Sequence, residues 1–140
     1  MNSVRKPAGE EASAGVLTAV WRKEPGDPKW DNDQDMKDYR AFMKQWAPSE
    51  PEAEGLAMHG YVTAKMIEAI LKRCGDDLTR GNLLEQATSV KELQLPLFIP
   101  GVFNISSAHR VAWRSARIAK FDGKGWQFVN DLMTIAPSAR

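Results

Sequence analysis

Three aspartates at alternate positions, Asp31, Asp33 and Asp35, have the spacing that most resembles a metal site. Such a triplet opens a calcium-binding loop, in which the sixth position must be Gly and the twelfth Glu. These two positions hold Met36 and Phe42 in this chain, so the pattern does not fit calcium. We expect the carboxylates to cap the helix that follows, because Asp side chains accept hydrogen bonds from the free N–H groups of a first helical turn.

The residues that most often bind zinc, His59, His109 and Cys74, are too widely spaced for a zinc pattern, which needs close ligand pairs. The sequence also has no glycine-rich phosphate loop, nucleophile elbow or HExxH helix. We therefore predict that the chain is not an enzyme and uses neither a metal nor a cofactor. His59 is either a residue that lines a cleft at a helix entrance or a surface or capping residue.

Four basic residues, Arg110, Arg114, Arg117 and Lys120, would form a ridge if their segment were helical. In a strand, Arg117 would face away from Arg110 and Arg114. The whole chain has 19 Lys and Arg against 18 Asp and Glu, a formal net charge of +1. This balance argues against a protein that coats nucleic acid or an anionic membrane, and we predict no nucleic-acid binding.

A chain of 140 residues, 43% of them hydrophobic, suits one globular domain. The most apolar stretch, Leu95–Phe103, contains two prolines and is too short to span a bilayer, so we predict no membrane insertion. Residues 1–14 are small, charged and polar, which predicts a disordered arm. Two glutamates stand where a secretion signal would need its apolar core, so we expect no such signal in this chain.

Hydrophobic spacing predicts the order of the secondary structure. The expected elements are a buried strand at Gly15–Trp21, a turn at Pro25–Pro28, a helix that carries an apolar stripe of Met36, Tyr39, Phe42, Met43 and Trp46, a long helix over Met58–Cys74, a short helix from Thr79 to Ser89, and a hairpin of Val111–Phe121 and Trp126–Val129 around the turn Asp122–Gly125. We expect the long helix to be the most buried one, with Gly75 ending it in a left-handed conformation.

Four segments in this order closely resemble one family: GVLTAVWRKEPGDPKWDNDQDMKDYRAFMKQW, HGYVTAKMIEAILKRCGDDLTRGNLLEQA, LQLPLFIPGVFNISSAHR and FDGKGW. They are similar to the C-terminal part of ABC-transporter substrate-binding proteins of the branched-chain amino acid type, which have the type I periplasmic binding protein fold. The resemblance covers nearly all of residues 15–129. It implies that the aromatic rings of the first long helix dock on a sheet.

The resemblance implies an α/β fold in which two lobes trap a ligand and close by hinge motion. Residues 15–130 would be a partial solute-binding domain, with about 15–105 in the first lobe, about 111–130 as strands of the second, and 131–140 as a tail. This is an incomplete lobe with helices on a sheet plus a C-terminal β-hairpin. Its uncovered edges and apolar faces predict self-association, for example by exchange of the hairpin between protomers, or else a truncated or split gene product.

The resemblance also implies a function: a solute-binding component of an ABC importer, a periplasmic protein that captures branched-chain amino acids, amides or related small carboxylates and presents them to a permease. The ligand-binding residues carried over from the family are Leu56, Ala57, Met58 and His59, in the loop before the long helix. Alternatively, this loop seals a core. The alternative function is an autonomous oligomeric interaction module that kept the scaffold and lost ligand binding.

Overall fold

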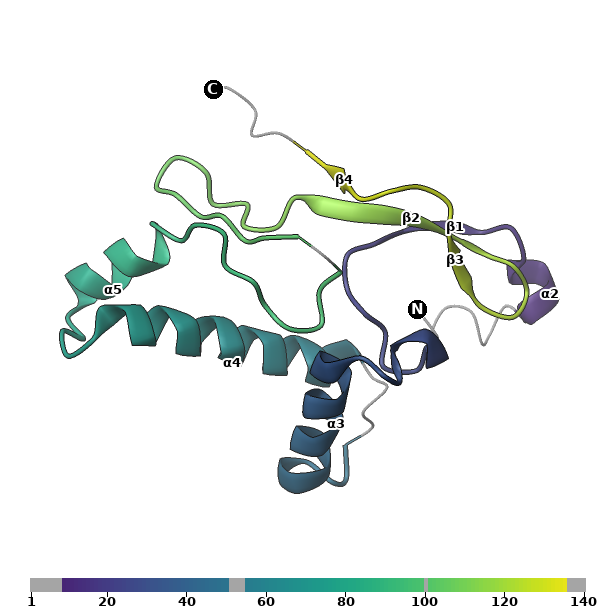
Figure 1. Ribbon diagram of the computed structural model, residues 1–140, viewed down its shortest axis with the longest axis horizontal. Coiled ribbons are helices and arrows are strands. Elements are labelled where there is room, and N and C mark those ends of the chain that lie inside the picture. Colours follow the sequence, from purple (N-terminus) through teal and green to yellow (C-terminus); the bar gives the residue numbers. More distant parts are fainter. Residues whose placement is uncertain (1–8, 51–54, 100, 136–140) are drawn as a thin grey trace. The chain divides into compact units, whose positions relative to one another are not determined.

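The computed structural model describes residues 9–50, 55–99 and 101–135 (Figure 1). These residues divide into two compact units. Unit 1 contains the described residues of Met1–Trp21 together with Ser115–Ile135, and unit 2 contains those of Arg22–Arg114. The division groups the first strand with the C-terminal hairpin, whereas the predicted lobes placed it with the helices. The assignment of segments to lobes of a binding protein stays a prediction.

Unit 1 is an antiparallel sheet. Its elements are α2 (Glu10–Ser13), β1 (Leu17–Val20), β2 (Ser115–Phe121), β3 (Trp126–Phe128) and β4 (Met133–Thr134). Strand β2 pairs with β1, β3 and β4, and the register sets Leu17 opposite Lys120 and Ala119 opposite Phe128. Ala119 and Phe121 of β2 are fully buried. The structure confirms the predicted hairpin, although its first strand begins at Ser115 and not at Val111.

The turn of this hairpin is held by Asp122. One carboxylate oxygen, Oδ1, accepts the backbone N–H groups of Lys124 and Gly125, both at 2.8 Å. Gly123 has φ 96°, a conformation that costs glycine little and other residues much. These hydrogen bonds favour the charged carboxylate and lower the pKa of Asp122. The Asp-Gly pair is thus the local reason why the two strands meet in this register.

Both ends of unit 1 differ from the predictions. Within the predicted disordered arm, Glu10–Ser13 form a helical turn in which Ser13 Oγ donates to the Gly9 carbonyl at 2.7 Å. In the predicted tail, Met133 and Thr134 pair with β2. The rest of the arm, residues 1–8, and of the tail, residues 136–140, lie outside the described residues. Strand β1 is also less buried than expected, since only its Val20 is buried.

Unit 2 contains the helices η1 (Pro28–Trp30), α3 (Gln34–Trp46), α4 (Gly55–Cys74) and α5 (Arg80–Ala87). As predicted, Asp33 caps α3 by accepting the N–H of Met36, and Thr79 caps α5. Gly75 has φ 58° directly after α4, also as predicted. The caps satisfy backbone donors that would otherwise lack partners at the helix starts.

The core of unit 2 lies between α3, α4 and the loop before residue 99. Its buried members are Met36, Tyr39, Met43, Met58, Tyr61, Val62 and Leu97. The rings of Tyr39 and Tyr61 meet edge to face with centroids 5.4 Å apart, a favourable arrangement for two aromatic rings. Within this unit Tyr39 packs on α4, and the expectation that the α3 rings dock on a sheet stays a prediction. Trp46, the last residue of the predicted stripe, is exposed.

A second aromatic cluster lies in the C-terminal part of unit 2. The rings of Phe98, Phe103 and Trp113 are mutually in contact, with centroids 4.7 to 4.9 Å apart. Gly101 lies against this cluster, and a Cβ atom there would be 2.5 Å from Cη2 of Trp113. The close approach therefore requires glycine at this position.

Candidate functional site

The four residues predicted to bind ligand lie in the first turns of α4 and not in a loop. Leu56 is 82% exposed and His59 is also exposed. Met58 is buried in the core of unit 2, and Ala57 packs against that core. The sequence left open whether this segment lines a ligand site or seals a core. In the structure two of its side chains face solvent, and two seal the core. Their role in ligand binding remains a prediction.

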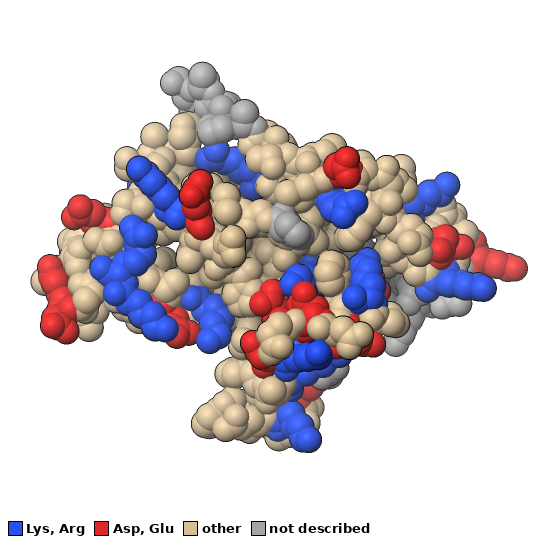
Figure 2. All heavy atoms as spheres, viewed as in Figure 1, with Lys and Arg blue, Asp and Glu red and all other residues tan. Residues whose placement is uncertain are grey.

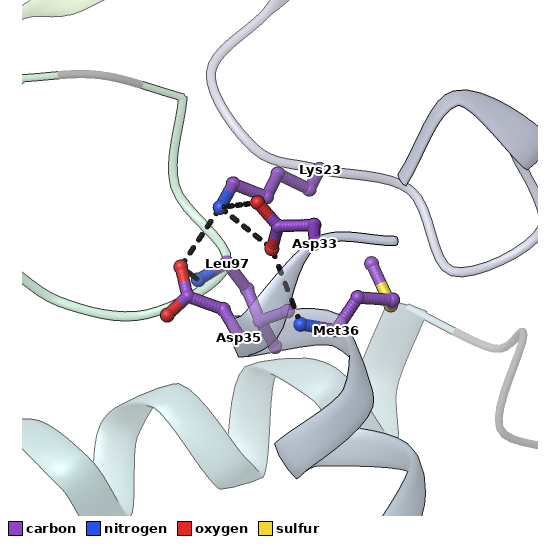
Figure 3. Close-up of polar contacts among 5 residues, drawn as sticks. All are labelled: Lys23, Asp33, Asp35, Met36 and Leu97. Atoms are coloured by element: carbon purple, nitrogen blue, oxygen red, sulfur yellow. Dashed lines mark hydrogen bonds and ion pairs between the residues drawn. The ribbon is translucent and has the colours of Figure 1, made fainter. Parts of the chain in front are cut away.

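The most polar buried arrangement in unit 2 joins Lys23 to two carboxylates (Figure 3). The Lys23 ammonium donates to both oxygens of Asp33, at 2.7 and 2.8 Å, and to Oδ2 of Asp35, at 2.8 Å. Asp33 lies at the N-cap of α3 and Asp35 lies in its first turn, so the helix start presents both carboxylates to one cation. The lysine side chain is only 10% exposed. A charge this shielded is stable only because it is paired.

The same arrangement fixes the backbone of Leu97. Its N–H donates to Oδ2 of Asp35 at 3.3 Å, and its carbonyl accepts the N–H of Lys23 at 2.7 Å. Leu97 has φ 66°, a strained conformation for a branched residue, and its side chain is fully buried. We name Lys23, Asp33, Asp35 and Leu97 the lysine cluster. It ties three segments together that are far apart in the sequence.

Two opposing effects act on the pKa of Lys23. Burial disfavours the charged form and lowers the pKa, whereas the hydrogen bonds to Asp33 and Asp35 and their negative charges raise it. The second effect is larger in sum, so the pKa of Lys23 lies above its ordinary value of 10.5. Lys23 is therefore fully protonated at neutral pH, and its role in this cluster is to hold the fold.

The aspartate triplet singled out in the sequence is divided among different partners. Asp31 accepts from Nη2 of Arg40 at 2.8 Å, and the same guanidinium nitrogen also donates to the carbonyl of Pro25 at 2.7 Å. Asp33 and Asp35 belong to the lysine cluster. In the part of the chain that the structure describes, no group of three or more His, Cys, Asp or Glu side chains is placed to hold a metal ion. The predicted capping role is confirmed for Asp33.

A groove of about 500 Å³ runs along the C-terminal half of α3 and the turn after it. Its lining residues are Arg40, Ala41, Met43, Lys44, Ala47, Pro48 and Glu50. The sequence offers no motif for it, because its residues are separate positions of a helix, among them the buried Met43, and of the turn that follows. Neither Leu56 nor His59 belongs to its lining, so the groove and the predicted ligand segment are separate features.

Two of the four basic residues considered for nucleic acid, Arg114 and Arg117, have local partners. Arg117 donates through Nε to the carbonyl of Asn130 at 2.9 Å and lies 4.1 Å from the centre of the Phe128 ring. Arg114 donates to the carbonyl of Val111. Arg117 is in a strand, whereas Arg110 and Arg114 precede it, so these residues do not form a helical ridge. On the face drawn in Figure 2, positive and negative side chains are interspersed.

Among the described residues, no helix combines the length and apolar character that crossing a membrane requires. No protein-family model matches the chain, and no curated protein matches its sequence.

The fold itself is similar to a solved structure, that of a branched chain amino acid ABC transporter from Thermus thermophilus with bound valine. The match has a TM-score of 0.65 and covers 90% of this chain at 14% sequence identity. It covers 35% of the transporter chain, so the present chain spans about a third of that protein. At this identity the likeness shows the fold alone. It supports the predicted partial α/β fold of helices and an antiparallel sheet.

Proposed function

We propose that this chain is a portion of a solute-binding component of an ABC importer. Its ligands would be branched-chain amino acids, amides or related small carboxylates, bound without covalent chemistry. The observation that carries the proposal is the structural match over 90% of the chain to a branched chain amino acid ABC transporter with bound valine. The order of the four sequence segments that resemble the binding-protein family supports it independently.

Within this proposal, the N-terminal end of α4 is the part of the chain that faces ligand. Leu56 offers an almost fully exposed apolar side chain, and His59 offers a hydrogen-bonding ring three residues later. Residues three apart on a helix are neighbours on its surface, so the two side chains can meet one small molecule. Met58 anchors this end of α4 in the core, and Ala57 packs beside it.

The proposal places the protein outside the cytoplasmic membrane, where a binding protein meets its solute. Its partner there would be the permease of the importer, which receives the ligand after capture. Conformational capture of this kind requires the ligand to bind one arrangement of the parts better than another.

Isothermal titration calorimetry tests the proposal directly. We expect at least one member of a panel of valine, leucine, isoleucine, phenylalanine, short amides and aromatic acids to give a saturable heat of binding to the chain. The variant His59→Ala should weaken that binding by about tenfold, the value of one lost hydrogen bond. The matched control Gln45→Ala, an exposed position on α3, should leave it unchanged.

A folded chain that gives no heat with any member of the panel contradicts the proposal. That result would favour the second candidate, an autonomous oligomeric interaction module that kept the scaffold and lost ligand binding. A specific observation supports this second candidate: large apolar side chains are exposed on both units, among them Leu17, Ile67 and Ile135.

A further inference from the structure

The turn between β2 and β3 contains the sole Asp–Gly pair of the sequence, Asp122 followed by Gly123. The side chain of Asp122 is exposed to solvent. Because glycine has no Cβ atom, the backbone nitrogen of Gly123 is less hindered than that of any other residue type. An aspartate carboxyl group can react with such a nitrogen to form a succinimide ring. The rate of that reaction depends on how the turn holds the carboxyl group.

Hydrogen bonds hold both oxygens of the Asp122 carboxylate. Oδ1 accepts the backbone N–H groups of Lys124 and Gly125, and Oδ2 accepts Nε2 of Gln127 at 3.2 Å. The side chain can move to a new position only by breaking some of these bonds. The same bonds, that of Gly125 most of all, lower the pKa of Asp122 and favour its ionised form. An ionised carboxylate lacks the hydroxyl group that must leave when the ring closes.

We propose that Asp122 is a site of spontaneous isoaspartate formation, and that the hydrogen bonds of its carboxylate slow this reaction while the hairpin is folded. In the first step the Gly123 nitrogen bonds to Cγ of Asp122, and the carboxyl hydroxyl leaves with the amide proton as water. In the second step solvent water opens the ring. Cleavage of the new N–Cγ bond restores aspartate. Cleavage of the original peptide bond leaves Gly123 attached through Cγ, which is isoaspartate.

The product would change the hairpin. Isoaspartate routes the main chain through Cβ and Cγ of residue 122, so the turn becomes longer by one atom and its carboxylate moves to Cα. The turn joins Phe121 to Trp126, which are partners in the sheet and whose rings have centroids 5.4 Å apart. Since the geometry of a turn sets the register of its strands, we expect isoaspartate to weaken this pairing. A hairpin that opens would thus expose a bond whose reaction hinders it from closing again.

Peptide mapping tests the proposal by comparing the 140-residue chain with the peptide AKFDGKGW, residues 119–126, in the same neutral buffer. Trypsin cleaves both after Lys120 and Lys124 and releases FDGK. Chromatography against synthetic FDGK with aspartate or isoaspartate then gives the extent of reaction. Isoaspartate should form in both samples. It should form at least about tenfold more slowly in the folded chain, the factor that one charge-assisted hydrogen bond provides.

A pair of variants tests the role of the hydrogen bonds. Gln127→Ala removes the donor to Oδ2 and should speed the reaction about threefold, the value of one exposed hydrogen bond. The matched control Gln45→Ala, at an exposed position of α3, should leave the rate unchanged. In urea that unfolds the chain, all three proteins should react equally fast, because the hairpin is then absent.

Two results would overturn the proposal. If neither the peptide nor the unfolded chain forms isoaspartate at residue 122, this residue is not such a site. If the folded chain reacts as fast as the peptide, or Gln127→Ala reacts no faster than the wild type, the hydrogen bonds do not protect it. None of these outcomes depends on amino acid binding.

Discussion

At the scale of single residues, Lys23 makes several polar contacts through both its side chain and its backbone. Its ammonium holds both carboxylates at the start of α3, and its backbone N–H holds the carbonyl of Leu97. Lys23→Met keeps the length of the side chain but leaves Asp33 and Asp35 without their cation. We expect the free energy of unfolding, measured by urea titration, to fall by about 2 kcal/mol, because partly buried charges lose charge-assisted hydrogen bonds.

The control for this variant is Lys29→Met, which removes a more exposed ion pair with Asp27. Its cost should stay below about 1 kcal/mol, as is usual for surface pairs. If the two variants lost the same free energy of unfolding, the lysine cluster would contribute no more to stability than a surface ion pair does.

The same cluster predicts a pH dependence. The pKa of Lys23 in the folded state is raised above 10.5. The stability that its charge contributes is therefore fully present below about 10.4, the pKa of lysine in the unfolded chain. The contribution is lost as the pH rises through the folded pKa. The stability difference between the wild type and Lys23→Met should therefore be constant from pH 7 to about pH 10 and shrink above it.

At the scale of elements, the aromatic cluster of unit 2 depends on the close approach at Gly101. Gly101→Ala would bring a Cβ atom to 2.5 Å from the ring of Trp113, which is itself packed on Phe98 and Phe103. The rings would have to shift, and we expect a loss of about 1 to 3 kcal/mol in the free energy of unfolding.

Gly81→Ala is the matched control for Gly101→Ala. Gly81 lies in the first turn of α5, and a Cβ atom there meets no other atom within 4 Å. Alanine is the better helix former, so this variant should gain about 0.5 kcal/mol. Thermal unfolding of both variants gives the comparison, and a Gly101→Ala protein as stable as Gly81→Ala would contradict the packing account.

The sequence predicted turns and helix ends well, because the signal for them lies in neighbouring residues. The Asp122–Gly125 turn, the Asp33 and Thr79 caps and the left-handed Gly75 all follow from neighbouring residues, and the structure contains each of them. Burial was predicted less well. Periodicity alone assigned Trp46 to the core, although Trp46 lies at the end of α3 beyond the buried part of the stripe.

The lysine cluster was harder to predict from the sequence, because its contacts are not local. The lysine cluster joins Lys23 to Leu97, and no spacing rule connects residues so far apart in sequence. Likewise, the Leu56–His59 segment was expected as a loop. The residues before it are acidic and include a proline, but the helix begins at Gly55 and takes this segment in.

At the scale of the whole molecule, each unit has its own buried anchor. Phe121 is fully buried in unit 1, and Tyr39 is fully buried in unit 2. Phe121→Ala should cost about 3 to 5 kcal/mol and should speed amide hydrogen exchange in β1, β2 and β3. Tyr39→Ala should have a similar cost and should speed amide hydrogen exchange in α3 and α4. Exchange measured by mass spectrometry should show reciprocal patterns, and a uniform increase in both variants would show that the chain unfolds as one unit.

The pairing of β1 with β2 also has a consequence for synthesis on the ribosome. Leu17 and Lys120 are partners in the sheet, yet all of Arg22–Arg114 lies between them in the sequence. Strand β1 must therefore wait until β2 has been made, and the large loop between them delays closure. All of unit 2 is translated during this wait, so a nascent chain halted before Ser115 would hold every helix from α3 to α5 while β1 still lacked a neighbour.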